Sequence, residues 1–125
     1  MLHEQISGKV ITAFYNVYNQ LGYGFLEKVY ENALIIELKK QGLQAVAQEA
    51  INVYYDEVRV GEYFANIIVN GVLILELKSV DLLRDEHFKQ LLNYLKATIK
   101  ELGLLLNFGK KPEFRRLILT QSENL

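Results

Sequence analysis

The stretch NIIVNGVLILELKS, residues Asn66–Ser79, joins two apolar segments through an Asn-Gly pair and ends with an acid and a base. Asn-Gly between two segments of this kind is typical of a β-hairpin turn. The second segment is almost entirely aliphatic, which is typical of a central strand covered on both faces. Glu76 and Lys78 lie two residues apart near its end, so both side chains point to one face of the sheet. The sequence therefore predicts a buried strand that ends in a paired carboxylate and ammonium group.

The length of the hairpin loop decides whether Asn66 joins this pair. A two-residue loop pairs Val69 with Val72 and places Asn66 on the opposite face from Glu76. A three-residue loop pairs Ile68 with Val72 instead. Asn66 and Glu76 then become diagonal neighbours, about 7–8 Å apart at the backbone. A site that uses both side chains therefore requires the longer loop.

The rest of the chain shows helical periodicity on both sides of this hairpin and period-two alternation just before it. The expected elements are a helix capped by Ser7, a helix over Leu26–Lys40, strands through Ile51–Tyr55, Val58–Val69 and Val72–Leu77, a helix over Asp85–Leu102, and strands over Leu104–Phe108 and Arg115–Thr120. The second helix is expected to bury Leu26, Val29, Tyr30, Ala33 and Leu34, and the third to bury Ile99 near its end. The order α-α-β-β-β-α-β-β predicts a single α/β domain over residues 1–125, a mixed sheet flanked by helices.

The composition is that of an ordinary globular protein, with 125 residues, 50% of them hydrophobic and 23% charged. The chain has no cysteine, which excludes disulfides and thiolate metal sites and is compatible with the cytoplasmic location that we expect. No apolar run approaches the ~18 residues of a membrane span, and the amino terminus lacks the pattern of a signal peptide, so we expect no membrane partner. The net charge is only -1, so binding to phosphate groups would require a local patch of positive charge.

An acid, a second oxygen ligand and a lysine at the end of a strand suit the hydrolysis of a phosphodiester bond. Carboxylates hold hard cations such as Mg²⁺, which also bind substrate phosphate. Such a cation helps to ionise the attacking water, and Lys78 can orient that water or neutralise developing charge. The same two residues, Glu76 and Lys78, are also typical of a buried ion pair, or of polar side chains that reach solvent at a strand end.

Four stretches of the chain, taken together, form a more specific pattern. They are GFLEKVYENAL (Gly24–Leu34), ANIIVNGVLILELKSV (Ala65–Val80), HFKQLLNYLKAT (His87–Thr98) and GLLLNFG (Gly103–Gly109). In this order they resemble the GxxExxY protein family, which is grouped with the PD-(D/E)XK nuclease superfamily, and the resemblance runs from about Ile6 to Thr120. It implies a restriction-endonuclease-like core, a site for Mg²⁺ or Mn²⁺ at the edge of the sheet, and nucleic acid as the substrate.

The resemblance also implies roles for individual residues. Glu27 matches the glutamate that names the family, and Glu76 and Lys78 match its E-x-K pair, so these three are the expected catalytic residues. Glu27, Asn66 and Glu76 are the expected metal ligands. The helical pattern, not the resemblance, singles out Glu37, which lies nearer the middle of the apolar stripe of its helix. It is expected to be a partly buried acid in a salt bridge or in helix packing, and the alternative is that it joins the site.

Gln90 and Tyr94 match a Q-x-x-x-Y signature, which implies that they bind the substrate. They are one helical turn apart and lie off the apolar stripe of their helix, a row that is equally typical of a solvated helix face. Positive side chains gather nearby and near the carboxyl end, where they could hold a nucleic-acid backbone or simply face solvent. They are Lys89, Lys96 and Lys100, and Lys110, Lys111, Arg115 and Arg116.

Asn66 stands where the superfamily pattern has an aspartate. An amide oxygen can coordinate Mg²⁺ but carries no charge, so this exchange removes one anion from a site whose other charges are those of Glu27, Glu76 and Lys78. The expected function is a metal-dependent nuclease-like protein that hydrolyses phosphodiester bonds in nucleic acid, weakened or inactive because of Asn66. The alternative is a catalytically inactive nuclease-fold module that binds nucleic acid or a protein partner. A homodimer that completes the cleft between two subunits is a third arrangement, which the apolar, tyrosine-rich first helix permits.

Overall fold

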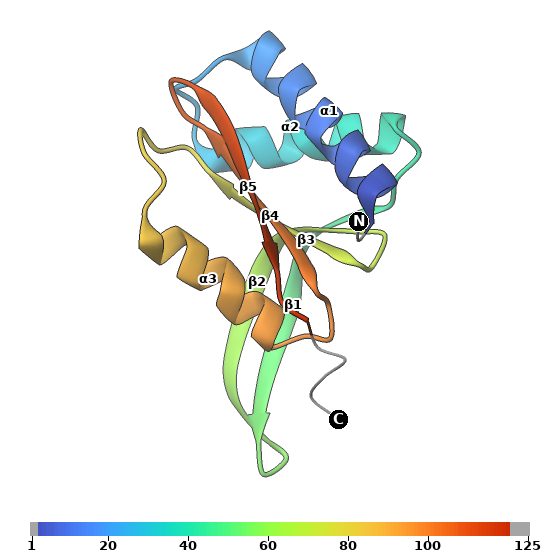
Figure 1. Cartoon of the computed structure of the whole chain (residues 1–125), viewed down its shortest axis with the longest axis vertical. Coiled ribbons are helices and arrows are strands. Elements are labelled where there is room, and N and C mark those ends of the chain that lie inside the picture. Colours follow the sequence, from blue (N-terminus) through green and yellow to red (C-terminus); the bar gives the residue numbers. More distant parts are fainter. Residues whose placement is uncertain (1–2, 121–125) are drawn as a thin grey trace.

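The two most buried strands, β3 (Leu73–Lys78) and β4 (Leu102–Phe108), lie parallel in the middle of a mixed sheet (Figure 1). The computed structural model describes residues 3–120, which form three helices and a five-stranded sheet in the order β1-β2-β3-β4-β5. The other elements are α1 (Glu4–Leu21), α2 (Glu27–Lys40), β1 (Ala45–Tyr55), β2 (Val58–Val69), α3 (Asp85–Lys96) and β5 (Pro112–Ile118). The predicted order of helices and strands is confirmed. Among residues 3–120, none of the helices is both long and apolar enough to span a membrane.

Helices cover both faces of the sheet, and the alternation of side chains along β3 divides the core between them. Leu75 and Leu77 pack against α1 and α2, whereas Ile74 packs under α3 with Leu91. The helix α3 is the crossover that a parallel pair of strands requires, because it carries the chain from β3 back to the start of β4. Glu76 shares the face of Ile74, so the strand period places its carboxyl group beneath α3.

The hairpin between β2 and β3 has a loop of three residues, 70–72, but its register differs from both alternatives weighed from the sequence. Val69 pairs with Leu73, and this register places Asn66 at the level of Glu76. The loop is held by the chain that precedes β1, because the Gln44 amide N–H donates to the Asn70 side-chain oxygen (2.8 Å). This long-range bond fixes a register that loop length alone could not decide.

The alternation of β2 slips by one residue at Asn66. Ala65 belongs to the core under α3, whereas Ile67, two residues further on, belongs to the core under α1 and α2. At the same level of β1, Gln48 has a left-handed backbone with φ of 56°. Beyond this irregularity β1 and β2 leave the rest of the sheet as a two-stranded arm, residues 49–64, which extends from the body in Figure 1.

Several features differ from the sequence prediction: among the strands, β1 begins at Ala45 rather than Ile51, and β5 spans Pro112–Ile118 rather than Arg115–Thr120. The helix α1 begins at Glu4, so Ser7 is a buried residue inside the helix rather than its cap. The helix α3 ends at Lys96, because Leu102 pairs with Leu73 in the sheet, and Ile99 is 90% exposed rather than buried. The apolar stripe predicted for α2 is wrong at its start, where Leu26 is 82% exposed and Val29 is 40% exposed.

A clip of hydrogen bonds ties the chain after β3 to the end of β4. The Val80 amide donates to the Asn107 side-chain oxygen (3.0 Å), and the Asn107 amide nitrogen donates to the Val80 carbonyl oxygen (2.8 Å). Gly109 lies against this clip, because a Cβ atom at this position would clash with the Val80 carbonyl oxygen. The clip therefore positions the end of β3, which carries Glu76 and Lys78.

We expect Gly109→Ala to destabilise the protein by about 1–3 kcal/mol, because the added methyl group must displace backbone rather than a flexible side chain. Gly8→Ala is the matched control: Gly8 lies on the exposed side of α1 with open space around its Cα, so alanine should stabilise the helix by up to about 1 kcal/mol. Urea unfolding of both variants checks this. Equal stability of Gly109→Ala and the parent would contradict the tight contact.

Candidate active site

The carboxyl group of Glu76 is the buried centre of the candidate site. Glu76 lies on β3 and is only 3% exposed. Its side chain hydrogen-bonds the Tyr94 hydroxyl group, and the Gln90 side-chain amide in turn donates to the Tyr94 hydroxyl oxygen (3.0 Å). The structure therefore joins three of the predicted site residues in one hydrogen-bonded chain between β3 and α3. Tyr94 is 4% exposed, so the alternative of a solvated helix face is wrong at this position.

The pKa of Glu76 is raised from 4.5 to about 7. Burial is the largest cause, because it disfavours the charged form. The Lys78 charge lowers the pKa, the Glu27 charge raises it, the hydrogen bond from Tyr94 lowers it, and the Glu31 charge raises it. At neutral pH this carboxyl group is thus partly protonated and sits among other acids, a position in which an added cation would favour its ionised form.

Glu31 is a buried acid of the site that the sequence analysis missed. It lies on α2, is 1% exposed, and accepts hydrogen bonds from Lys28 (2.7 Å), Gln48 (2.7 Å) and Asn66 (3.0 Å). Burial raises the pKa of Glu31, but the hydrogen bonds from Lys28, Asn66 and Gln48 outweigh it, so the pKa falls below its ordinary value. Glu31 is therefore ionised at neutral pH. Its position four residues after Glu27, one turn along the same helix, is the signal that could have found it.

Asn66 bridges α2 and β3 with both ends of its amide group. Its nitrogen donates to Glu31, and its oxygen accepts from the Leu77 backbone N–H (2.9 Å). The second bond lies where β2 and β3 separate, so the side chain satisfies a backbone donor that the ladder leaves open. An aspartate could accept from Leu77 but could not donate to the ionised Glu31. The amide is thus matched to the carboxylate beside it.

Glu27 and Lys78 complete the set of predicted site residues. Glu27 is the first residue of α2 and is partly exposed, and its charge acts on Glu76. Lys78 is partly buried at the end of β3, and within residues 3–120 it forms no ion pair with Glu76 at 4.0 Å or less. The structure therefore does not show a closed Glu76–Lys78 pair, and the ammonium group is available to a ligand.

The fold agrees with a match to a known protein family. A family model of the PD-(D/E)XK nuclease superfamily matches residues 4–117. The chain belongs to this superfamily. The α/β architecture, with its mixed sheet and flanking helices, is the restriction-endonuclease-like fold predicted from the sequence. No curated protein and no solved structure shows a significant match. The narrower likeness to the GxxExxY family stays a prediction.

PD-(D/E)XK nucleases typically use divalent metal ions, and the donor chemistry of this chain fits such an ion in part. Within residues 3–120, no three His, Cys, Asp or Glu side chains form a group that could hold one metal ion. Glu27 and Glu76 nevertheless supply two carboxylates, which are the donor type that Mg²⁺ prefers. Their negative charges repel each other, because the Glu27 charge raises the pKa of Glu76. Glu31 is less suited, because its oxygens already accept three hydrogen bonds.

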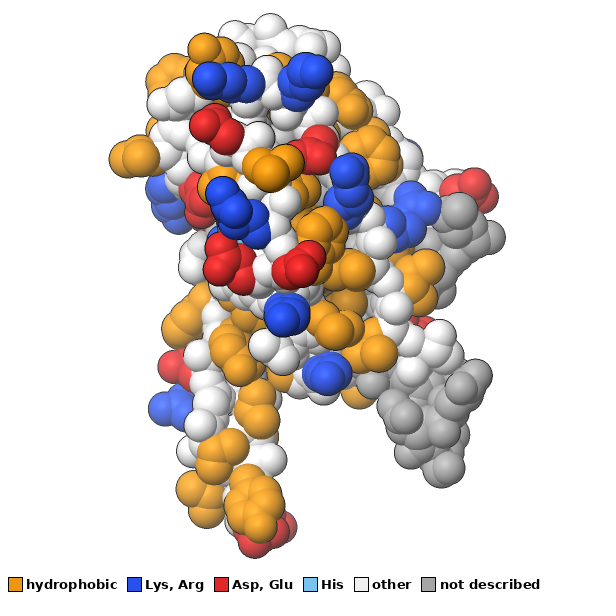
Figure 2. Space-filling model, turned by 60° about the vertical axis from the view of Figure 1, so that its left-hand side comes forward, with side chains coloured by type: hydrophobic (Ala, Val, Ile, Leu, Met, Phe, Trp, Pro, Cys, Tyr) orange, Lys and Arg blue, Asp and Glu red, His pale blue; other side chains and the backbone are white. Residues whose placement is uncertain are grey.

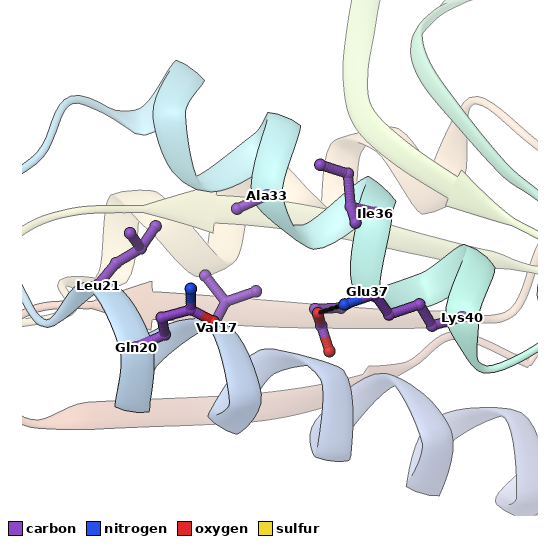
Figure 3. A pocket seen from close by; sticks show the side chains of 7 residues that line it. All are labelled: Val17, Gln20, Leu21, Ala33, Ile36, Glu37 and Lys40. Carbon is purple, nitrogen blue, oxygen red and sulfur yellow. Dashed lines mark hydrogen bonds and ion pairs between the residues drawn. The ribbon is translucent and has the colours of Figure 1, made fainter.

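A separate cavity of about 170 Å³ lies between α1 and α2 (Figure 3). It is lined by Val17, Gln20, Leu21, Ala33, Ile36, Glu37 and Lys40. Glu37 bonds Lys40 (3.1 Å) and Asn16 (3.3 Å), which confirms the prediction of a partly buried acid in a salt bridge. No residue of the Glu76 site lines this cavity, so Glu37 serves as a glutamate outside the site in the experiments below.

We expect Asn66→Asp to destabilise the protein by on the order of 3 kcal/mol at neutral pH, since it places a second carboxylate against the buried Glu31. The double variant Asn66→Asp with Glu31→Gln exchanges the two groups and restores an amide–carboxylate bond, so it should recover most of this loss. Urea unfolding in EDTA measures both, with Glu31→Gln alone as the control. An Asn66→Asp protein as stable as the parent would refute the match between the two side chains.

The pKa of Glu76 predicts how stability changes with pH. The pKa is higher in the folded chain (about 7) than in the unfolded chain (4.5), so the folded state binds the proton more tightly. The contribution of the protonated Glu76 to the free energy of unfolding is therefore complete below pH 4.5 and is lost as the pH rises through about 7. The difference corresponds to about 3 kcal/mol. Glu31, with a lowered pKa, affects stability only below this window.

Glu76→Gln removes this titration while leaving a group that Tyr94 can still bond. Its free energy of unfolding in EDTA should change less than that of the parent between about pH 5 and pH 8, and it should exceed the parent at the alkaline end. Denaturation at several pH values gives the comparison. Parallel curves for the two proteins would show that Glu76 titrates normally.

Proposed function

We propose that this protein is a metal-dependent nuclease-like enzyme that hydrolyses phosphodiester bonds in nucleic acid. The observation that supports it most is the carboxyl group of Glu76, buried on the central strand with its pKa raised to about 7 beside the Glu27 and Glu31 charges. A carboxyl group whose pKa is raised by burial destabilises the metal-free protein at neutral pH. Groups with strongly shifted pKa values gather at functional sites. Membership of a nuclease superfamily gives the chemistry that this group would serve.

The metal, Mg²⁺ or Mn²⁺, would be held by Glu27 and Glu76. When bound, it supplies a Lewis acid that polarises the phosphodiester and lowers the pKa of a water molecule. Asn66 is the third proposed ligand. Because its oxygen already accepts from the Leu77 N–H, it would use its second lone pair. This arrangement gives the site one charged ligand fewer than the superfamily pattern, so we expect weak affinity for the ion.

The other side chains of the site bind and orient. Lys78, on the same face of β3 as Glu76, would orient the attacking water or neutralise charge that develops on the phosphate oxygens. Tyr94 holds the Glu76 carboxyl group, and Gln90 orients Tyr94 (3.0 Å). Gln90, which is partly exposed, would contact the substrate strand next to the scissile bond, with Tyr94 buried behind it.

A second candidate function follows from the hydrogen bonds of Asn66. Both ends of this amide are engaged by the protein itself, to Glu31 and to Leu77, as in a scaffold that is stable without a metal. Such a scaffold could bind nucleic acid or a protein partner without cleaving anything. The two candidates differ in whether a cation enters the site.

The decisive assay is cleavage of single- and double-stranded DNA and RNA in Mg²⁺ and in Mn²⁺. Glu76→Gln and Lys78→Met should each lower the rate by about 10²-fold or more, the effect typical of removing a charged group from a transition state. Glu37→Gln, which changes a glutamate outside the site, should leave the rate unchanged. Cleavage that persists in Glu76→Gln would overturn the proposal, because it would come from a contaminant or from another site.

A thermal-shift experiment separates the two candidates where cleavage is too slow to see. If the nuclease proposal holds, Mn²⁺ should raise the Tm of the parent at neutral pH and have little effect on Glu76→Gln. A parent that shows neither cleavage nor a Mn²⁺-dependent shift would favour the binding module.

A further inference from the structure

The arm and α3 enclose a depression of about 190 Å³ beside the candidate active site. It is lined by Val53, Tyr63, Asn93, Lys96 and Ala97. The ring of Tyr63 contacts that of Tyr94, with centroids 5.3 Å apart and planes tilted by 49°. Since Tyr94 bonds Glu76, this contact connects the depression directly to the buried carboxyl group.

The lining of the depression combines four kinds of group. Tyr63, 37% exposed, offers an accessible aromatic ring, while Val53 and Ala97 supply apolar walls. Asn93 carries a donor and an acceptor, and Lys96 carries a positive charge. A flat heteroaromatic ring with a polar edge and an attached phosphate matches this set, and stacking of a base on an aromatic side chain is worth about 1–3 kcal/mol.

The charges around the depression give the bound molecule a direction. Lys89, Asn93 and Lys96 recur along α3 at a spacing that places them on one face, and neither lysine forms an ion pair within residues 3–120. The arm is acidic instead, with four acids against one base: Glu49, Asp56, Glu57, Glu62 and Arg59. Figure 2 shows apolar side chains running along the arm, with separate positive side chains on the body beside its upper end. The first turn of α3 carries Asp85 and Glu86, so phosphates are attracted to the later part of the helix, at Lys89 and Lys96, and repelled by the arm, while bases can reach Tyr63.

We propose that this depression between the arm and α3 binds single-stranded nucleic acid, with an unpaired base against Tyr63 and the adjoining phosphate beside Lys96. This proposal names the kind of nucleic acid that the proposed nuclease would bind. It rests on the proposed function for the cleavage that would follow binding. In a duplex the faces of the bases are stacked and their edges paired, so no base can enter a depression of this kind without leaving the helix. A single strand presents its bases at little cost.

Fluorescence anisotropy in EDTA tests the binding without any cleavage. The probes are a labelled oligothymidine, a labelled oligouridine and a DNA duplex of the same length. We expect the single strands to bind at least about tenfold more tightly than the duplex. Equal affinity for strand and duplex would overturn the proposal.

Variants at Tyr63 separate the aromatic ring from its bulk. Tyr63→Leu should weaken binding of the single strand by about 5- to 100-fold, because it keeps an apolar side chain but removes the ring. Tyr63→Phe should bind like the parent, and Tyr55→Leu, at the exposed tip of the arm, should also leave binding unchanged. Equal binding by Tyr63→Leu and the parent, with both folded by circular dichroism, would overturn the role of the ring.

Lys96→Gln tests the phosphate contact. It should weaken binding and reduce the slope of log K against log salt by about 0.7, the value expected for one phosphate contact on a single strand. Lys39→Gln, an exposed lysine on α2, is the matched control and should change neither quantity. An unchanged salt slope for Lys96→Gln would remove Lys96 from the contact.

Two further outcomes are distinguishable. If the protein cleaves nucleic acid but Tyr63→Leu affects neither binding nor cleavage, this proposal fails and the nuclease proposal stands. If single strands bind as expected but nothing is cleaved, the nuclease proposal fails alone. If nucleic acid does not bind and the chain instead sediments as a dimer that Tyr55→Leu weakens, the arm is a protein interface and the proposal is wrong.

Discussion

A carboxyl group fixed on the central strand beneath α3 is the constraint around which this molecule is built. Leu75 and Leu77, the neighbours of Glu76, fill the core under α1 and α2, so the strand period leaves Glu76 no face other than that of α3. Burial raises its pKa, and the surrounding groups act in opposite directions: Lys78 and Tyr94 favour the carboxylate, whereas Glu27 and Glu31 oppose it. A protein that only needed a stable core could place an aliphatic residue here. The proposed role in holding a metal ion gives a reason for an acid at this position.

Asn66 stands where the resemblance predicts an aspartate, and the structure gives this difference another meaning than the sequence does. From the sequence alone, asparagine in place of aspartate would leave the proposed metal site with one negative charge fewer. In the fold, however, Glu31 lies 3.0 Å from the amide nitrogen, ionised and held by two further donors. The chain therefore still carries a carboxylate at this level of the sheet, on α2 instead of β2. The amide joins that carboxylate to the backbone of β3 at the point where the sheet divides.

The sequence was sufficient for the features that depend on short-range patterns. The Asn-Gly turn, the aliphatic central strand and the one-turn spacing of Gln90 and Tyr94 each follow from local chemistry, and the structure contains all three. What it could not provide depends on contacts between distant parts of the chain. The register of the hairpin is fixed by the bond between Asn70 and Gln44, and α3 ends early because the sheet takes Leu102 into β4.

Glu31, the acid of the site that the sequence analysis missed, was missed for the same reason. Glu31 looks like one more surface acid on a helix, and only the slip of β1 and β2 at Gln48 and Asn66 brings the two side-chain amides of these residues against it. A non-glycine residue in the left-handed region, such as Gln48, carries no signature in a sequence read by period alone. Such irregularities occur where a strand changes its direction, and here they also direct the arm away from the body.

The most direct test of this account is a ¹³C NMR titration of the Glu76 side-chain carboxyl group, assigned by its absence in Glu76→Gln. In EDTA the account predicts a midpoint near the value of about 7 that burial and the neighbouring acids impose. Addition of Mg²⁺ should then move the midpoint to lower pH, because the cation favours the ionised form. A midpoint at the ordinary value of 4.5 that does not respond to Mg²⁺ would contradict this account. The surroundings of Glu76 would then not raise its pKa, and Glu76 would not be a metal ligand.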